Sequence, residues 1–196
     1  LAKGNIDLAQ QLTPLLPVER ALPLNRWLAL LEQPARTLDT LIANPADEVE
    51  AEALLAGFKR LARQDRDAAM LRFDGLVQSR GWSAAVASPY ALSLAFGLAW
   101  DRRPEALQYF AKVLPADFDE EALEWQARAA LWASDWNLAT RTIAAMSPAL
   151  RQSTRWRYWE ARAADQLQDK QRARQLFESV LQDNDFYSAM AAAQLD

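Results

Sequence analysis

One segment of the sequence occurs twice in succession, at a constant shift of 34 positions. Residues 124–146 match residues 158–180, and the second copy repeats several residues of the first, namely Trp125 as Trp159, Ala127 as Ala161, Arg128 as Arg162, Asp135 as Asp169 and Ala139 as Ala173. A period of this length is typical of a two-helix unit that buries its apolar face only against neighbouring units. The repeat therefore predicts an all-α fold, a right-handed superhelix (α-solenoid) of antiparallel helix hairpins, with no compact core around one pocket.

The apolar residues are of the kinds that favour helices. The sequence of 196 residues contains 39 Ala and 30 Leu, against 6 Val and 3 Ile. Ala and Leu are strong helix formers, whereas β-branched residues favour strands. The 5 Gly are too few for a turn-rich β protein. We therefore expect nearly the whole chain to be helical.

Proline residues divide the sequence into pieces of helix length, because proline favours the first turn of a helix or the residues just past its end. Ser88-Pro89 fits a capping residue followed by the first helical residue, so a helix is expected to start there. The expected helices are 5–13, 23–32, 34–43, 47–64, 66–79, 89–102, 104–114, 119–134, 136–146, 152–168, 170–183 and 185–195. No linker rich in Gly, Ser or Pro separates two parts, which predicts one domain over residues 1–196.

Composition excludes several classes of function. The absence of Cys and His excludes Ser-His-Asp catalysis, thiolate catalysis and the usual transition-metal ligands. The net charge of −4 does not fit a nucleic-acid-binding protein, which usually carries an excess of basic residues. No apolar run reaches the length of about 18 residues that a membrane span needs. The first residues, Leu1 to Gly4, do not resemble a signal peptide or a natural start, so we expect the sequence to be a fragment of a longer chain.

Three sequence motifs near the C-terminal end resemble the soluble lytic murein transglycosylases. Trp156-Arg157-Tyr158-Trp159-Glu160-Ala161 is followed by Ala173-Arg174-Gln175-Leu176-Phe177, and an aromatic pair, Phe186-Tyr187, then leads into Ala191-Ala192-Ala193-Gln194-Leu195. In that family, motifs of this kind stand near the end of a long superhelical, U-shaped domain that precedes the catalytic domain. The motif-level match covers residues 119–196.

The resemblance implies a periplasmic parent enzyme that acts on peptidoglycan. Such enzymes cleave the bond between N-acetylmuramic acid and N-acetylglucosamine without water and leave a 1,6-anhydro end, using one Glu on a lysozyme-like domain. The sequence lacks the family's Gly-Leu-Met-Gln and Ala-Tyr-Asn-Ala-Gly motifs, and Glu178-Ser179 lies on an amphipathic helix without their context. We therefore expect no catalytic residue, cofactor or metal in this chain, and a role in shaping or guiding the glycan strand.

The candidate glycan-contacting surface is a group of basic and aromatic residues at helical spacing, Arg151, Arg155, Tyr158 and Arg162. Arginine can hold the carboxylates of peptidoglycan peptide stems in bidentate fashion. The competing interpretation makes the tryptophans core residues and pairs the arginines with acids such as Glu160 and Asp165. We also expect most of the eight tryptophans, among them Trp125, Trp132 and Trp136, to pack between helices.

Two other features have alternative interpretations. The acidic residues Asp117, Asp119, Glu120 and Glu121 are expected to cap a helix, because they lack the spacing of a calcium loop. The 34-residue period also fits a tetratricopeptide-like scaffold for a protein or peptide partner, although the usual Trp, Leu, Gly and Tyr pattern of its first helix is not met. Other cell-wall proteins are further candidate partners, and an independent helical enzyme would have to rely on carboxylates alone.

Overall fold

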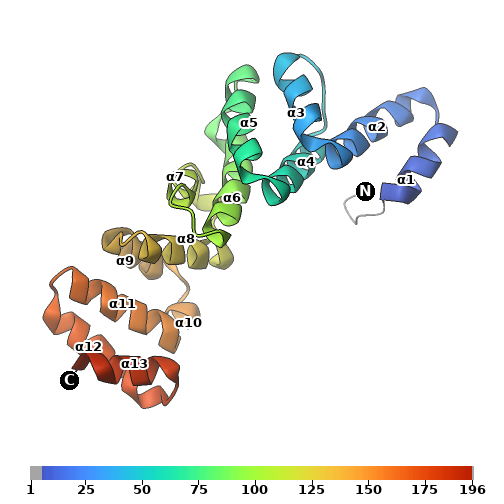
Figure 1. Ribbon diagram of the computed structural model, residues 1–196. Helices are drawn as coiled ribbons and strands as arrows, with labels where there is room; N and C mark the ends of the chain where they lie inside the picture. The colour runs from blue at the N-terminus through green and yellow to red at the C-terminus, as the bar shows by residue number, and fades with distance from the viewer. Residues whose placement is uncertain (1–5, 196) are drawn as a thin grey trace. The chain divides into compact units, whose positions relative to one another are not determined.

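The computed structural model describes residues 6–195, and every regular element in that range is helical (Figure 1). The α-helices are α1 (Ile6–Leu12), α2 (Val18–Glu32), α3 (Pro34–Ala43), α4 (Ala51–Gln64), α5 (Arg66–Ser79), α6 (Ala84–Trp100), α7 (Ala106–Phe110), α8 (Glu120–Trp132), α9 (Trp136–Ala145), α10 (Pro148–Arg151), α11 (Thr154–Gln166), α12 (Lys170–Val180) and α13 (Phe186–Leu195). Short 3-10 helices are η1 (Thr13–Leu15), η2 (Pro115–Asp117) and η3 (Leu181–Asp183). None of the helices described is long and apolar enough to cross a membrane.

The chain forms two compact units. The first comprises the described residues up to Leu98 together with Tyr109–Asp117, and the second comprises Ala99–Gln108 together with the described residues from Phe118 onward. Each unit has its own buried apolar residues and is described separately below. A single domain over the whole chain stays a prediction.

In the first unit, helices two apart in the sequence pack against each other. Helix α2 packs against α4, and α3 packs against α5, while single residues connect α2 to α3 and α4 to α5. Gly57 of α4 permits the close approach to α2, because a Cβ atom at this position would lie 2.8 Å from Leu30 Cβ. The ring of Phe58 contacts those of Phe73 and Tyr90, with centroids 6.3 and 5.2 Å away. Large aromatic rings and one small residue thus fill the space between the helices.

In the second unit, the two copies of the sequence repeat form the hairpins α8–α9 and α11–α12. Asp135 and Asp169 each cap the second helix of their hairpin, accepting hydrogen bonds from the Leu138 and Arg172 amides at 2.9 and 3.2 Å. A carboxylate at this position satisfies a free amide of the first turn. The duplicated aspartates therefore explain why the second helices begin 34 residues apart.

The turns within the two hairpins also share one backbone conformation. Ser134 and Gln168 have φ values of +56° and +67°, which L residues rarely adopt. In both turns the amide of the following aspartate donates to a carbonyl five residues earlier, Ala130 or Ala164, at 2.9 Å. This is the Schellman arrangement that ends helices, and Gly81 adopts it after α5 with a φ of +60°.

Small residues of the repeat lie between the large ones in the second unit. Ala127 packs with Ile143, Met146 and Trp156, and none of the four side chains is more than 4% exposed. Another buried cluster gathers around Tyr158 and is formed by Ala161, Ala164, Ala173, Phe177, Val180 and Ala191. Trp159 packs against both clusters. The core of this unit is therefore a continuous layer between successive helices and not a central cavity.

The expected helix starts at Pro23 and Pro89 are wrong. Both prolines lie inside a helix, since α2 begins at Val18 and α6 at Ala84. Each is the sixth residue of its helix and lies past the four amides that lack an intrahelical acceptor. Proline has no amide, so each helix loses the hydrogen bond to the carbonyl four residues earlier. Ser88, expected to cap a helix, is instead buried within α6, where its Oγ accepts from the Leu114 amide at 2.8 Å and donates to Asp117.

Other helix boundaries agree more closely with expectation. Helix α4 begins at Ala51 and not at residue 47, and the Asp47 carbonyl accepts a hydrogen bond from Arg80 Nη2 at 3.1 Å. The expected start of the first helix, residue 5, lies outside the described residues. Asp119 caps α8, as expected of the acidic residues, through a 2.8 Å hydrogen bond from the Ala122 amide.

Candidate functional site

The predicted glycan-contacting residues lie on two helices of the second unit and not on one. Arg151 ends α10, whereas Arg155, Tyr158 and Arg162 belong to α11. Gln152 and Ser153 separate the two helices, and the Ser153 hydroxyl donates to the Leu150 carbonyl at 2.7 Å. The helical spacing assumed from Arg151 onward therefore does not hold, because the chain turns before α11 begins.

Arg151 belongs to an ion cluster built around a buried carboxylate. The Glu160 side chain is 4% exposed. It accepts hydrogen bonds from Arg151 Nε at 3.2 Å, Arg151 Nη2 at 2.7 Å and Arg172 Nη2 at 2.6 Å. Burial raises the pKa of Glu160, but hydrogen bonds from both arginines outweigh it and hold the pKa below the ordinary 4.5. The same hydrogen bonds raise the pKa of Arg151.

Arg155 joins a similar cluster around Glu124, a residue of α8. Glu124 Oε1 accepts from Arg155 Nη2 at 2.6 Å and from the Trp156 indole at 2.9 Å, while Oε2 accepts from Arg128 at 3.3 Å. The Arg155 guanidinium also lies 5.2 Å from the Trp156 ring centroid. These contacts tie α11 to the preceding hairpin, which is a structural role.

Tyr158 is not a surface residue. Its side chain is 2% exposed and contacts the rings of Phe177 and Tyr187, with centroids 5.9 and 5.6 Å away. Burial raises the pKa of its hydroxyl group, and the Arg162 charge lowers it to a smaller extent. Arg162 itself donates to Gln194 of α13. The prediction of an exposed tyrosine between exposed arginines is therefore wrong for Tyr158, because that face of α11 packs against α12 and α13.

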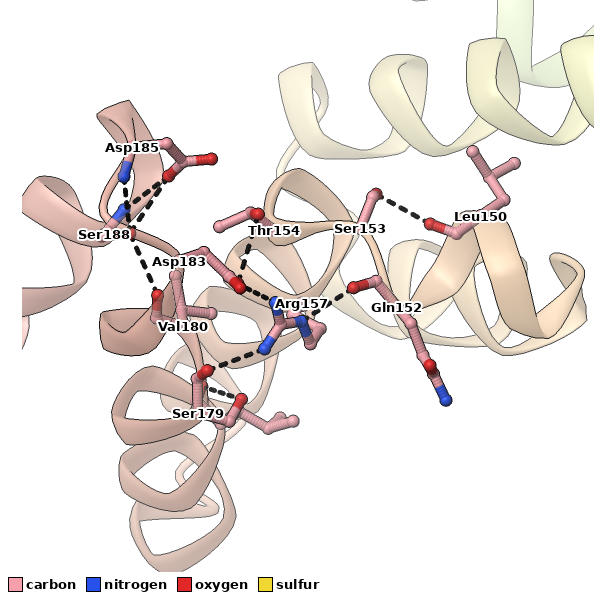
Figure 2. A network of polar contacts seen from close by, with 11 residues as sticks. Leu150, Gln152, Ser153, Thr154, Arg157, Ser179, Val180, Asp183, Asp185 and Ser188 are labelled. Carbon is pink, nitrogen blue, oxygen red and sulfur yellow. Dashed lines mark hydrogen bonds and ion pairs between the residues drawn. The ribbon is translucent and has the colours of Figure 1, made fainter.

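Arg157, which belongs to the motif that begins at Trp156, forms hydrogen bonds at the end of α12 (Figure 2). Arg157 donates from Nε to the Gln152 carbonyl at 2.9 Å, from Nη1 to the Ser179 carbonyl at 2.7 Å, and from Nη2 to Asp183. Beyond this turn, Ser188 and Asp185 exchange hydrogen bonds at the start of α13. The basic motif thus serves mainly to join helices.

Arginine pairing leaves part of the predicted surface accessible. The Arg151 and Arg155 side chains are each 39% exposed although both are paired. Glu178, which was expected to be an ordinary surface residue, is 52% exposed and pairs with Arg174 at 2.9 Å. Contact of glycan with Arg151, Arg155 and Arg162 stays a prediction.

A row of aromatic rings in the second unit was not anticipated from the sequence. Trp100, at the end of α6, lies 5.5 Å from Trp125 of α8, and Trp125 lies 6.5 Å from Trp132 of the same helix, measured between ring centroids. Trp100 is 69% exposed and Trp132 is 44% exposed. The expectation that Trp132 packs between helices is therefore wrong. A seven-residue spacing places Trp125 and Trp132 on one face of α8.

The first unit contains a groove of about 1220 Å³ between α2, α3, α4 and the turn that precedes α4. The charged residues that line it are Arg26, Arg36, Arg80, Glu32, Asp47, Glu48 and Glu50. The indole nitrogen of Trp27, another lining residue, is buried without a hydrogen-bond partner. Because charges of both signs line the groove, it does not indicate the sign of a ligand.

Solved structures with a similar fold are known. No protein-family profile matches the chain, and neither does any curated protein. Among solved structures, the lytic transglycosylase Slt of Pseudomonas aeruginosa, solved as an inactive mutant, matches 97% of the chain with a TM-score of 0.77 and 27% identity. The 70-kDa soluble lytic transglycosylase of Escherichia coli matches 98% with a TM-score of 0.69 and 20% identity. A structure of a 70-kDa soluble lytic transglycosylase with bulgecin A gives the same TM-score at 19% identity.

The fold and these similarities define the class of the protein. It is an all-α solenoid of helix pairs, which confirms the fold class predicted from the repeat. More particularly, the chain is similar over 97% of its length to a segment of a soluble lytic transglycosylase, which confirms the resemblance that its C-terminal motifs indicated. It spans 31% of the length of each of the solved structures that it matches.

Proposed function

We propose that this chain is a non-catalytic, superhelical segment of a periplasmic peptidoglycan lytic transglycosylase, and that it holds or guides the glycan strand for a C-terminal lysozyme-like domain. That domain would cleave the bond between N-acetylmuramic acid and N-acetylglucosamine to a 1,6-anhydro product. The observation that carries the proposal is the similarity over 97% of the chain, at 27% identity, to a lytic transglycosylase.

The chemistry of the described residues supports a binding role and not a catalytic one. A general acid for glycoside cleavage needs a carboxyl group whose pKa is raised, as in an apolar pocket. Glu160 is the buried carboxylate, but two arginines lower its pKa, so it stays ionised and lacks a proton to donate. The ion clusters at Glu160 and Glu124 instead hold the hairpins in register.

The proposal is tested with the 196-residue chain and purified peptidoglycan sacculi. We expect the chain to cosediment with sacculi and to release no soluble muropeptides. Release of anhydro-muropeptides would place a catalytic centre in this chain and refute the non-catalytic part of the proposal. Failure to cosediment, combined with capture of a defined protein or peptide partner, would favour the tetratricopeptide-like scaffold instead.

A second measurement asks whether the predicted arginine surface contributes. Changing Arg155 and Arg162 together to Ala should weaken binding of muropeptides, and Arg174→Ala is the matched control because Arg174 is 74% exposed and lies on α12. Since Arg155 also pairs with Glu124, the urea midpoint of the double variant is measured alongside. An unchanged affinity in a folded double variant would show that these two arginines are structural only.

A further inference from the structure

The tryptophan row of the second unit has the features of a ligand surface. Its members, Trp100, Trp125 and Trp132, follow one another at centroid distances of 5.5 and 6.5 Å, with interplanar angles of 49° and 54°. Leaving apolar area in water costs roughly 25 cal/mol per Å². Exposed indole rings that lie side by side therefore indicate a surface on which a ligand binds. The exposure of Trp100, 69%, is too large for a ring that only fills a gap between helices.

Two guanidinium groups lie over this row. The Arg128 Cζ atom is 4.8 Å from the Trp125 ring centroid, and the Arg102 Cζ atom is 5.3 Å from the Trp132 ring centroid. Arg128 also pairs with Glu124, whereas Arg102 is exposed and forms no ion pair among the described residues. Arg102 adopts a φ of +56°, in the turn between α6 and α7. The row therefore combines flat apolar faces with a cation that forms no ion pair within residues 6–195.

We propose that Trp100, Trp125, Trp132 and Arg102 form a binding platform for a glycan strand that carries carboxylates. This proposal rests on the proposed function and names the part of the chain that performs it. Sugar rings present apolar C–H faces that stack on indole rings, and a guanidinium holds a carboxylate through two parallel hydrogen bonds. A strand of alternating N-acetylglucosamine and N-acetylmuramic acid offers both groups, since each muramic acid bears a lactyl carboxylate.

The charges around the tryptophan row favour a glycan that carries carboxylates over a neutral glycan. The whole chain has a net charge of −4, so an anionic ligand is attracted only where a cation is locally uncompensated. Arg102 supplies such a cation at one end of the row. We therefore expect the tryptophans to provide most of the affinity and Arg102 to provide the preference for an acidic sugar.

The experiment uses two soluble probes of equal length, a peptide-free muramic acid-containing oligosaccharide and a neutral oligomer of N-acetylglucosamine. Binding of both is measured by calorimetry with the unchanged chain, the double variant Trp100→Ala/Trp132→Ala and the variant Arg102→Gln. Phe186→Ala is the matched control, because Phe186 is 70% exposed and lies away from the row on α13. Urea midpoints establish that each variant is folded.

The expected result is a loss of about tenfold in affinity for both probes in the double tryptophan variant, and no loss in the control. Arg102→Gln should weaken binding of the muramic acid probe about threefold or more and leave the neutral probe unaffected. If the unchanged chain binds and the folded double variant binds equally well, the platform is refuted and the proposed function stands. If the unchanged chain binds neither the probes nor sacculi, the proposed function itself fails and the platform fails with it.

Discussion

Replacement of Glu160 by Gln tests whether a buried carboxylate holds the last hairpin together. The side chain is 4% exposed and accepts three hydrogen bonds from Arg151 and Arg172. Gln keeps the shape but removes the charge. Its amide oxygen can still accept a hydrogen bond, whereas its amide nitrogen, in place of the second carboxylate oxygen, cannot accept from a guanidinium donor. Hydrogen bonds to a charged group contribute about 1.5–3 kcal/mol. Because Arg151 and Arg172 are 39% and 46% exposed, water can solvate them afterwards, so we expect a total loss of about 2–3 kcal/mol.

The loss is measured by urea unfolding followed by tryptophan fluorescence. With a slope of about 2 kcal/mol per M, the midpoint should fall by roughly 1–1.5 M. The matched control is Glu178→Gln, which makes the same chemical change in an ion pair where Glu178 is 52% exposed. Exposed pairs of this type contribute about 0.3–0.5 kcal/mol, so the control midpoint should hardly move.

The same carboxylate makes stability depend on pH. Its pKa in the folded protein is depressed below 4.5, so the folded state favours the ionised form. Its contribution is fully present above the pKa of the unfolded chain and is lost as pH falls from about 4.5 through the folded-state value. The free energy of unfolding of Glu160→Gln should therefore lie below that of the unchanged chain at neutral pH, and the gap between the two should become smaller in acid. Equal losses for Glu160→Gln and Glu178→Gln, or a difference that does not narrow in acid, would refute the reasoning.

Two glycines give further predictions. Gly57→Ala should destabilise the first unit by about 1–3 kcal/mol in urea unfolding, because the new methyl group meets Leu30 Cβ at 2.8 Å and cannot rotate away; Gly75→Ala, which meets the flexible end of Ile42 at 3.1 Å, is the control and should cost less. A loss in Gly57→Ala no greater than in the control would contradict the close packing of α2 on α4. Gly81→Ala should cost about 1 kcal/mol through its φ of +60° alone, since no atom lies within 4 Å of the added Cβ; an unchanged melting temperature would show that the turn relaxes freely.

The sequence predicted the fold best where local signals agreed with one another. In the two hairpins, the alanines that permit close packing and the aspartates that cap the second helix recur together, so both helices and their turns followed from the repeat. Proline was the weaker signal. Pro23 and Pro89 each lie in the sixth position of a helix, and the sequence alone does not show whether packing compensates for a missing hydrogen bond there.

The site was predicted less well than the fold. Helical spacing indicates which residues share a face, but it does not indicate which acid of another helix meets that face. Glu124 lies 31 residues before Arg155, and only the packing of α11 beside the preceding hairpin brings them to 2.6 Å. The same limit applies to Trp132, which follows the apolar pattern of α8 but is 44% exposed. Exposure depends on how repeats stack, and that information is spread over the whole chain.

The turns at Ser134 and Gln168 have a consequence for how such a chain evolves. Each turn is closed by amide and carbonyl groups of the backbone, and the side chain at its left-handed position takes no part in those hydrogen bonds. Mutation can therefore change the identity of that residue, as Ser and Gln illustrate, without altering the joint. A gene encoding such units could be lengthened by duplication, and the new copies could diverge in surface chemistry while keeping the same turn between their helices.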